Sequence, residues 1–427
     1  MIMQLADSAF DSPRRRVLAV AAACHPDRGS EPGLGWAWIK ALAERHDLWV
    51  IVGEREGNRP AIQRELRKNP MLREHLRIFF VPRPNPPRIT RLCPPLYYRY
   101  YRQWHALAFA IARRLHDEIR FDVAHQINMI GYREPGYLWR LNLPFVWGPI
   151  DGVTNMPLRF WRILGIGGTA YYVVYNLINT WQRRFAPRVQ QARARAGALA
   201  AASEGTQRLL RQLCNTQSHV IHDTGPVETG SAETKRPRDG EPLRLVWSGL
   251  HIPRKGLPIL LHALRRLPTD TRVHVDILGG GPRTRAWQRL ATRLGIHARL
   301  TWRGRLSKAE ALDVMRAGHV FVITSLRDAT SSVLMEALSL GLPVICLDHC
   351  GFTDVVTPAC GIKIPLTHTD DVIAGFARVI ADLAHKPDVV RDLSEGALER
   401  ARTFSWRANA SAMTELYEQA IAHWAAP

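Results

Sequence analysis

The chain has 427 residues, 46% of them hydrophobic, which is enough for more than one core, so two domains are the default expectation. Its six cysteines form no C-x-x-C pair and no Cys/His spacing typical of zinc sites, which indicates a reducing compartment and no structural metal. The net charge is +20, and residues 1–225 hold +15 of it, with 32 Lys and Arg against 17 Asp and Glu. Charge alone leaves nucleic acid, anionic lipid head groups, pyrophosphate carriers and an unspecific solvated face all open.

The N-terminal region is expected to lead into a buried strand. Residues 17–24 are apolar but only as long as a strand, and they follow three arginines. They end at His25, Pro26 and Asp27, where a secretory signal would end in small residues. We therefore favour a first β-strand over a signal peptide.

The first half alternates short apolar runs with amphipathic helical patterns. This alternation predicts βαβ units around a parallel sheet. The expected strands are residues 17–23, 48–52, 78–81, 123–126 and 145–147, and the expected helices include residues 35–46 and 97–119.

Residues 163–182 contain no charge over 20 positions and have arginines on both sides. This length could span a bilayer. Three glycines, two asparagines and a glutamine argue against spanning. Aromatic residues beside the arginines suit an interfacial helix pair or the wall of an acceptor channel, and a buried helix hairpin is the alternative.

Residues 223–242 have the polar, Gly- and Pro-containing composition of a linker. After them the alternation of strands and helices restarts and predicts a second doubly wound sheet. Its expected strands are residues 243–247, 272–278, 299–302, 320–324 and 343–347, and its expected helices are residues 257–267, 284–294, 308–317 and 332–340. Two such halves would bind ligands at the carboxyl ends of their strands, in a cleft between the domains.

Two glycines follow the first strand. Gly33 and Gly35 come just before a helix expected to begin near Trp36, where backbone N–H groups can approach an anion. We predict a phosphate cradle at this loop. The spacing is not G-x-G-x-x-G, and a plain turn is the alternative.

A basic junction follows the first strand of the second half. Gly249, Arg254 and Lys255 lie between this strand and the next helix. Two adjacent cations beside a helix N-terminus are suited to neutralising a departing diphosphate. A solvated basic turn is the alternative.

Two carboxylates, Asp328 and Glu336, lie on either side of the start of a predicted helix. Carboxylates accept hydrogen bonds from the vicinal hydroxyls of a sugar. Glu336 is surrounded in sequence by apolar residues, and such a polar group demands a partner. Thr330, Ser331 and Ser332 are expected to cap the helix and to offer further donors.

These residues, in this order, resemble the retaining GT-B glycosyltransferases of the family-4 type over nearly the whole chain. In that family two acids with seven residues between them hold the donor, the first at the transferred sugar and the second at the ribose. Asp328 and Glu336 take these places, although the family usually has Glu first and a glycine-rich stretch after it. The other matching residues are Gly33 and Gly35 in the N-terminal phosphate loop, Lys255 and Gly256 at the diphosphate with Arg254 in place of the usual arginine, Gly249, Gly280 and Gly281 near the nucleotide, Ser331 and Ser332 at the donor, and His125 near the reacting sugar.

The resemblance implies an α/β protein with two facing Rossmann-like domains. The expected acceptor domain is residues 1–222, including residues 157–188 as membrane or acceptor helices. The expected donor domain is residues 243–404, joined through the linker 223–242. Residues 405–427 are expected to form a helix that crosses back to the first domain.

The resemblance also implies a retaining hexosyltransferase that needs no metal and no cofactor besides its nucleotide-diphosphate sugar. In this interpretation Arg254 and Lys255 stabilise the leaving diphosphate, Asp328 and His125 lie at the reacting sugar, and no protein base is required. The acceptor would be a glycan or a lipid-linked sugar, as in exopolysaccharide synthesis. The expected location is the cytoplasm, at the inner face of an anionic membrane, and nucleic acid is not an expected partner.

Other functions stay open at this point. A nucleotide-sugar epimerase or a glycan phosphorylase could share the fold, but the latter needs a lysine-bound pyridoxal site that nothing in the sequence suggests. A nucleic-acid-binding protein is favoured by the isoelectric point near 10.4, yet no recognition motif is present. A non-catalytic membrane scaffold could use residues 157–188.

Overall fold

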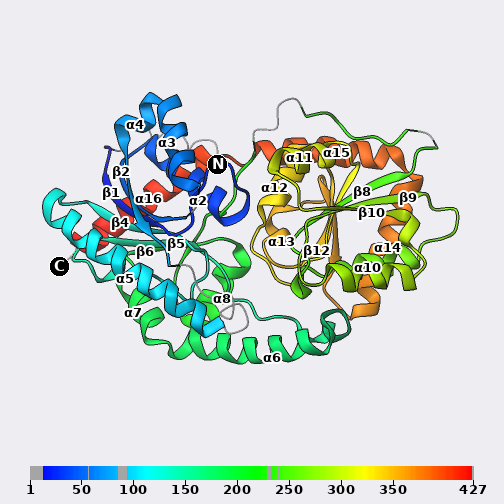
Figure 1. The fold of residues 1–427 in the computed structure, drawn as a ribbon, viewed down its shortest axis with the longest axis horizontal. Coiled ribbons are helices and arrows are strands. Elements are labelled where there is room, and N and C mark those ends of the chain that lie inside the picture. The colour runs from blue at the N-terminus through cyan, green and yellow to red at the C-terminus, as the bar shows by residue number, and fades with distance from the viewer. Residues whose placement is uncertain (1–12, 56, 85–93, 228–231, 239, 426–427) are drawn as a thin grey trace. The chain divides into compact units, whose positions relative to one another are not determined.

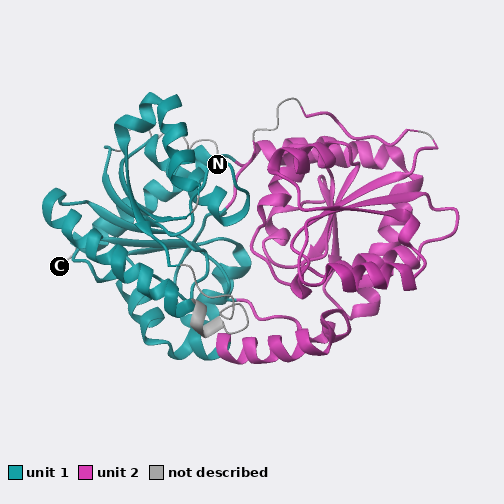
Figure 2. Cartoon of the chain, in the orientation of Figure 1, with its two compact units in different colours: residues 1–153, 180–223, 405–427 teal, residues 154–179, 224–404 magenta. Residues whose placement is uncertain are grey.

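A computed structural model describes residues 13–55, 57–84, 94–227, 232–238 and 240–425. The chain divides into two compact units (Figure 2). Unit 1 comprises residues 1–153, 180–223 and 405–427, and unit 2 comprises residues 154–179 and 224–404.

Unit 1 is built on a seven-stranded parallel sheet with the order β3-β2-β1-β4-β5-β6-β7. All five strands predicted for this half are confirmed, and two short strands, β6 and β7, complete the sheet. The strands are β1 Arg16–Ala21, β2 Asp47–Glu54, β3 Leu76–Pro82, β4 Val123–Asn128, β5 Phe145–Ile150, β6 Ala198–Ala201 and β7 His219–Val220. The helices are α2 Ser30–Ala43, α3 Asn58–Lys68, α4 Pro70–His75, α5 Pro94–Ile119, α7 Pro187–Arg195, α8 Glu204–Cys214 and α16 Trp406–Ala425.

The apolar run of β1 explains why it is central. Successive side chains of a strand point to opposite faces, so a strand covered on both faces has no polar position. Val17 and Ala19 pack with α2 and α16 on one face, whereas Leu18 and Val20 pack with α5 on the other. Helices therefore cover both faces of this sheet (Figure 1).

The C-terminal helix α16 belongs to the core of unit 1. Met413, Leu416 and Tyr417 are buried in the same cluster as β1 and α2. The Tyr417 hydroxyl also lies 2.7 Å from Nδ1 of His125 on β4. Apolar burial and a buried hydrogen bond both fix this last helix to the first sheet.

Unit 2 contains a six-stranded parallel sheet with the order β10-β9-β8-β11-β12-β13. The strands and helices predicted for this half are confirmed. The strands are β8 Leu243–Ser248, β9 Val273–Leu278, β10 Leu300–Gly304, β11 Val320–Ile323, β12 Val344–Asp348 and β13 Gly361–Pro365. The helices are α9 Leu257–Arg265, α10 Thr284–Arg293, α11 Lys308–Arg316, α12 Ser332–Ser339, α13 Phe352–Val355, α14 Thr369–His385 and α15 Pro387–Arg402.

The uncharged segment forms helix α6, Trp161–Phe185, which is interrupted at Gly165 (φ 71°, ψ 167°). The alternative interpretation as a buried helix hairpin is wrong, because one continuous helix follows this break up to Phe185. Gly165 allows the break because a residue without Cβ adopts positive φ at little cost. Among the described residues, no helix is long and apolar enough to cross a membrane.

Candidate functional site

Five of the predicted site residues, Gly249, Arg254, Lys255, Asp328 and Ser331, lie in the loops at the carboxyl ends of β8 and β11. These two strands are neighbours in the sheet of unit 2, although β9 and β10 separate them in sequence. The strand order therefore reverses between them, and a doubly wound sheet binds ligands at this kind of switch point. Residues 249–256 connect β8 to α9, and residues 324–331 connect β11 to α12.

An ion triad joins the two loops. The Nη1 atom of Arg254 lies 3.2 Å from Oδ1 of Asp328, and Nζ of Lys255 pairs with the other oxygen. Burial alone would raise the pKa of Asp328, but Lys255 and Arg254 outweigh burial and hold it below its usual range. Two cations against one anion leave one positive charge in excess, which suits an anionic ligand.

Two hydrogen bonds of Thr324 and a close backbone contact at Gly256 fix the triad in place. Thr324 Oγ1 accepts a hydrogen bond from Trp247 Nε1 at 2.9 Å and donates to the Lys255 carbonyl at 2.8 Å. A Cβ on Gly256 would lie 2.2 Å from the Thr324 carbonyl oxygen, and the φ of Gly256 is 63°. Glycine is required there because both the close approach and the left-handed backbone exclude a side chain. The two cations are thus positioned by the core of the unit.

Glu336 is the unusual group of the site. It lies on α12, half-buried, and no hydrogen bond or ion pair holds its carboxylate within the described part of the chain. Burial raises its pKa to about 7, while the charge of Lys308 acts in the opposite direction. A carboxylate kept partly out of water without a donor is ready to accept hydroxyl groups from a ligand.

The loop 249–252 lies directly against the loop 279–283. Gly249 N donates to the Leu278 carbonyl at 3.2 Å, and His251 N donates to the Gly280 carbonyl at 3.2 Å. A Cβ on Gly281 would lie 2.8 Å from the His251 carbonyl oxygen. The structure therefore brings Gly249, Gly280 and Gly281 together, and their role at the nucleotide stays a prediction.

The start of α12 differs from the expectation. Ser331 occupies the N-cap position with a φ of 69°, but its side chain accepts no capping hydrogen bond. The predicted capping by this hydroxyl is therefore wrong, because the positive φ directs the side chain away from the first turn. The hydroxyls of Ser331 and Ser332 have no hydrogen-bond partner within the described residues and stay free for a ligand.

Sequence reasoning missed several residues that support this site. Asp328 N donates to Cys350 Sγ at 3.2 Å, and Arg327 Nε donates to the Thr154 carbonyl at 3.0 Å. The guanidinium of Arg327 also lies 4.5 Å from the ring centre of Tyr175 on α6. No sequence spacing connects these positions. The uncharged, aromatic sequence of α6 was the one feature that could have indicated that this helix contributes to the site.

Gly33 and Gly35 do not form the expected open loop. Helix α2 begins at Ser30, six residues earlier than expected, so both glycines lie inside it. A Cβ on Gly33 would lie 2.1 Å from the Arg28 carbonyl oxygen, and one on Gly35 would lie 2.2 Å from that of Ala23. Close approach of the chain to itself explains both glycines, and their role as phosphate ligands stays a prediction.

His125 lies on β4 of unit 1 and is fully buried. Its Nε2 lies 2.7 Å from the Gly148 carbonyl, and its Nδ1 lies 2.7 Å from the Tyr417 hydroxyl. The carbonyl accepts only, so Nε2 carries the hydrogen and Nδ1 accepts from Tyr417. Burial lowers the pKa of His125 to about 4, partly offset by the bond to Gly148. With both nitrogens occupied, this histidine has no atom left for a substrate, and we interpret it as a structural residue.

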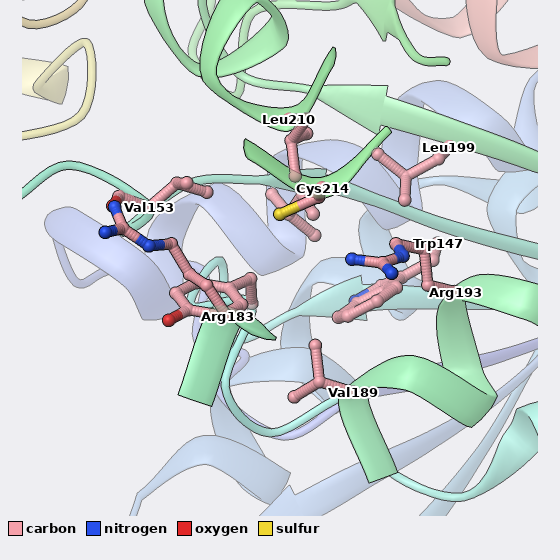
Figure 3. A pocket seen from close by; sticks show the side chains of 10 residues that line it. Trp147, Val153, Arg183, Val189, Arg193, Leu199, Leu210 and Cys214 are labelled. Atoms are coloured by element: carbon pink, nitrogen blue, oxygen red, sulfur yellow. The ribbon is translucent and has the colours of Figure 1, made fainter. Parts of the chain in front are cut away.

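Two hollows lie within unit 1, and neither includes a predicted site residue. The first is a cavity of about 10 Å³ lined by Trp147, Arg183 and Cys214, among others (Figure 3). It has room for about one water molecule. The second is an open depression of about 520 Å³ whose lining includes Arg193 and His423.

No group of three or more His, Cys, Asp or Glu side chains that could hold a metal ion occurs in the part of the chain that the structure describes.

Comparison with known proteins begins with the family model described as Glycosyl transferases group 1, which matches residues 232–400. The chain is 30% identical over 189 residues to D-inositol 3-phosphate glycosyltransferase of Saccharomonospora viridis, covering 42% of this chain and 43% of that protein. It is 27% identical over 196 residues to MMP alpha-(1->4)-mannosyltransferase of Mycolicibacterium hassiacum, covering 45% and 47%. The chain thus matches less than half the length of these curated relatives.

Solved structures resemble the chain over nearly its full length. Sucrose-phosphate synthase from Thermosynechococcus elongatus matches with a TM-score of 0.64 at 18% identity, covering 96% of this chain and 100% of that one. The Anabaena protein HepE, solved with UDP-glucose, matches with a TM-score of 0.62 at 16% identity, covering 94% and 99%. At these identities the likeness establishes the fold, which is GT-B, as predicted.

The raised pKa of Glu336 predicts a pH-dependent stability. Its folded-state pKa of about 7 exceeds the ordinary value of 4.5, so the folded state holds this proton more tightly than the unfolded state. The free energy of unfolding should therefore fall as the pH rises from about 4.5 to about 7, by at most about 3 kcal/mol. Urea unfolding across this range would measure it. Glu336→Gln cannot titrate at this position, so its free energy of unfolding should lack this pH-dependent decrease. Identical pH profiles for the two proteins would contradict the raised pKa of Glu336.

Proposed function

We propose, from the match of residues 232–400 to the family model described as Glycosyl transferases group 1, that the chain is a retaining, metal-independent glycosyltransferase. It moves a hexose from a nucleotide-diphosphate sugar to a glycan or lipid-linked acceptor in polysaccharide synthesis. The observation that carries the proposal is the triad of Arg254, Lys255 and Asp328 on two neighbouring loops, with Glu336, which has no partner among the described residues, on helix α12 directly after the second loop.

The two cations fit a leaving diphosphate. When the bond between the anomeric carbon and the phosphate oxygen breaks, negative charge develops on that oxygen. Arg254 and Lys255 are held before the ligand arrives, so they stabilise this charge without first having to reorganise. They supply the positive charge that a divalent metal would otherwise provide.

The two carboxylates fit the hydroxyl groups of the donor. Glu336 accepts from the ribose, and Asp328 accepts from the transferred hexose while remaining paired with the cations. Neither attacks the sugar; both orient it, and correct orientation alone lowers the barrier to reaction. The free hydroxyls of Ser331 and Ser332 are further donors to the same ligand.

The reaction in this proposal needs no protein base. The acceptor hydroxyl attacks the anomeric carbon on the face from which the diphosphate departs, and its proton passes to the departing phosphate oxygen. The anomeric configuration is then retained. His125 takes no part in this chemistry, because its ring is buried and both its nitrogens are bonded.

We also propose that the reaction takes place in the cytoplasm, at the inner face of the cell membrane. The basic charge of residues 1–225 supports a lipid-linked acceptor that carries pyrophosphate.

A thermal-shift panel tests the donor site. UDP, GDP, ADP and dTDP, each with chelator present, would be added to the wild type and to Glu336→Ala. We expect one nucleotide to raise the wild-type midpoint and to have little effect on the variant, because a ligand stabilises only the state that binds it. No shift from any nucleotide, or equal shifts in both proteins, would argue against the proposal.

Turnover of Lys255→Ala tests the role of the cations. Losing one preorganised charge at the leaving group should lower kcat by about 10²- to 10³-fold, with a smaller change in the KM for the donor. Lys386→Ala on the surface of unit 2 is the matched control and should behave as the wild type. Equal losses in both variants, or activity that disappears with chelator, would contradict this mechanism.

A further inference from the structure

Helix α6 exposes an unusual amount of apolar surface. Nine of the fifteen large apolar side chains exposed among the described residues lie on it. Ile166 is 88% exposed and Leu177 is 67% exposed, and Val173, Val174, Ile178 and Trp181 are exposed with them. At 100° per residue these six positions fall on one side of the helix. They form a continuous apolar strip, which we call the α6 outer face.

The opposite side of α6 faces the protein, and its polar side chains are hydrogen-bonded there. Asn176 exchanges hydrogen bonds with both backbone groups of Met156, at 2.8 and 2.9 Å. Asn179 donates to Asn155 Oδ1 at 2.8 Å, and Arg183 donates to the Val153 carbonyl at 2.6 Å. Tyr172 is also buried on this inner side, so α6 has apolar side chains on both sides and lacks the polar outer side of a usual surface helix. Nothing in the described residues covers the apolar outer face.

Charge indicates what covers the outer face. From residue 152 to residue 203 the chain contains seven arginines and no lysine, aspartate or glutamate. Arg162, which lies 4.0 Å from Asp370, and Arg184 are exposed near the two ends of α6. The guanidinium of Arg162 lies 5.3 Å from the ring centre of Trp161, and that of Arg184 lies 6.0 Å from that of Phe185. An apolar strip with aromatic side chains and flanking arginines matches the boundary between the acyl chains and the anionic head groups of a bilayer.

We infer that the α6 outer face docks on an anionic membrane, with the helix lying in the plane of the lipid surface. This assigns the membrane contact to particular residues and does not depend on the donor chemistry proposed above.

The inner side of α6 connects this surface with the candidate donor site. A Cβ on Gly168 would lie 3.5 Å from the Pro253 side chain, next to Arg254. Tyr175 lies against Arg327, whose carbonyl accepts a hydrogen bond from Arg254 at 2.8 Å. Since a helix with its side chains is about 10 Å across, docking would hold the loop that carries Arg254 and Lys255 about one helix diameter from the lipid. A lipid-borne pyrophosphate acceptor would meet the donor at this depth.

Co-sedimentation of the full chain with vesicles tests the inference. We expect binding to vesicles that contain phosphatidylglycerol at low salt, weaker binding at high salt, and little binding to pure phosphatidylcholine. The double variant Leu177→Glu and Trp181→Glu should lower the partition coefficient about tenfold or more. Leu107→Glu, at a position 53% exposed on α5, is the matched control and should bind as the wild type.

Two further readouts separate the outcomes. The double variant should keep the wild-type melting temperature and the wild-type response to nucleotide, so a failed donor site and a failed membrane surface are distinguishable. Sedimentation velocity without lipid should show the same mass for wild type and variant. The inference would be overturned if the double variant bound vesicles as the wild type does, or if the wild type did not bind at low salt. A wild-type dimer that the double variant dissociates would also overturn it, because the α6 outer face would then contact a second copy of the chain.

Discussion

The ion triad of Arg254, Lys255 and Asp328 is the constraint on which the site depends. It joins two loops that leave adjacent strands, and the three charges are largely removed from water. Removing Asp328 from this group would leave two largely buried cations uncompensated, which is costly. The triad therefore requires that Thr324, Trp247 and the backbone of Gly256 hold the loops in register. The excess positive charge that remains is the reason why this end of the sheet attracts an anion.

Much of unit 2 could be predicted from the sequence because its strands are short, buried apolar runs between clear helical patterns. The spacing of Asp328 and Glu336 also predicted that both would flank the start of one helix, and α12 begins between them. The ion triad itself could not be foreseen, because periodicity does not specify which side chains meet across two loops. The φ of Ser331 was equally hidden, since a non-glycine residue at positive φ leaves no mark in the pattern.

Unit 1 was harder to predict for reasons that lie in particular residues. Gly33 and Gly35 were interpreted as a phosphate cradle because glycines between a strand and a helix let backbone N–H groups approach an anion, yet both lie inside α2, where the chain packs closely against itself. His125 was assigned to chemistry because it matches the histidine near the reacting sugar in the family that the sequence resembles. Its hydrogen bond to Tyr417 comes from a helix 292 residues further along the chain, and no local signal reports such a contact. For helix α6 the sequence showed that residues 163–182 carry no charge. It did not show that the apolar side chains of this helix point outward, which only the structure reveals.

The measurement that tests the account most directly is a crystal structure of the chain with the nucleotide sugar that stabilises it. The account predicts the diphosphate against Arg254 and Lys255, the ribose hydroxyls on the Glu336 carboxylate, and the hexose beside Asp328, with no metal between protein and phosphate. A nucleotide bound elsewhere, a Glu336 carboxylate without contact to it, or a metal ion bridging the phosphates to the protein would contradict the proposed donor site.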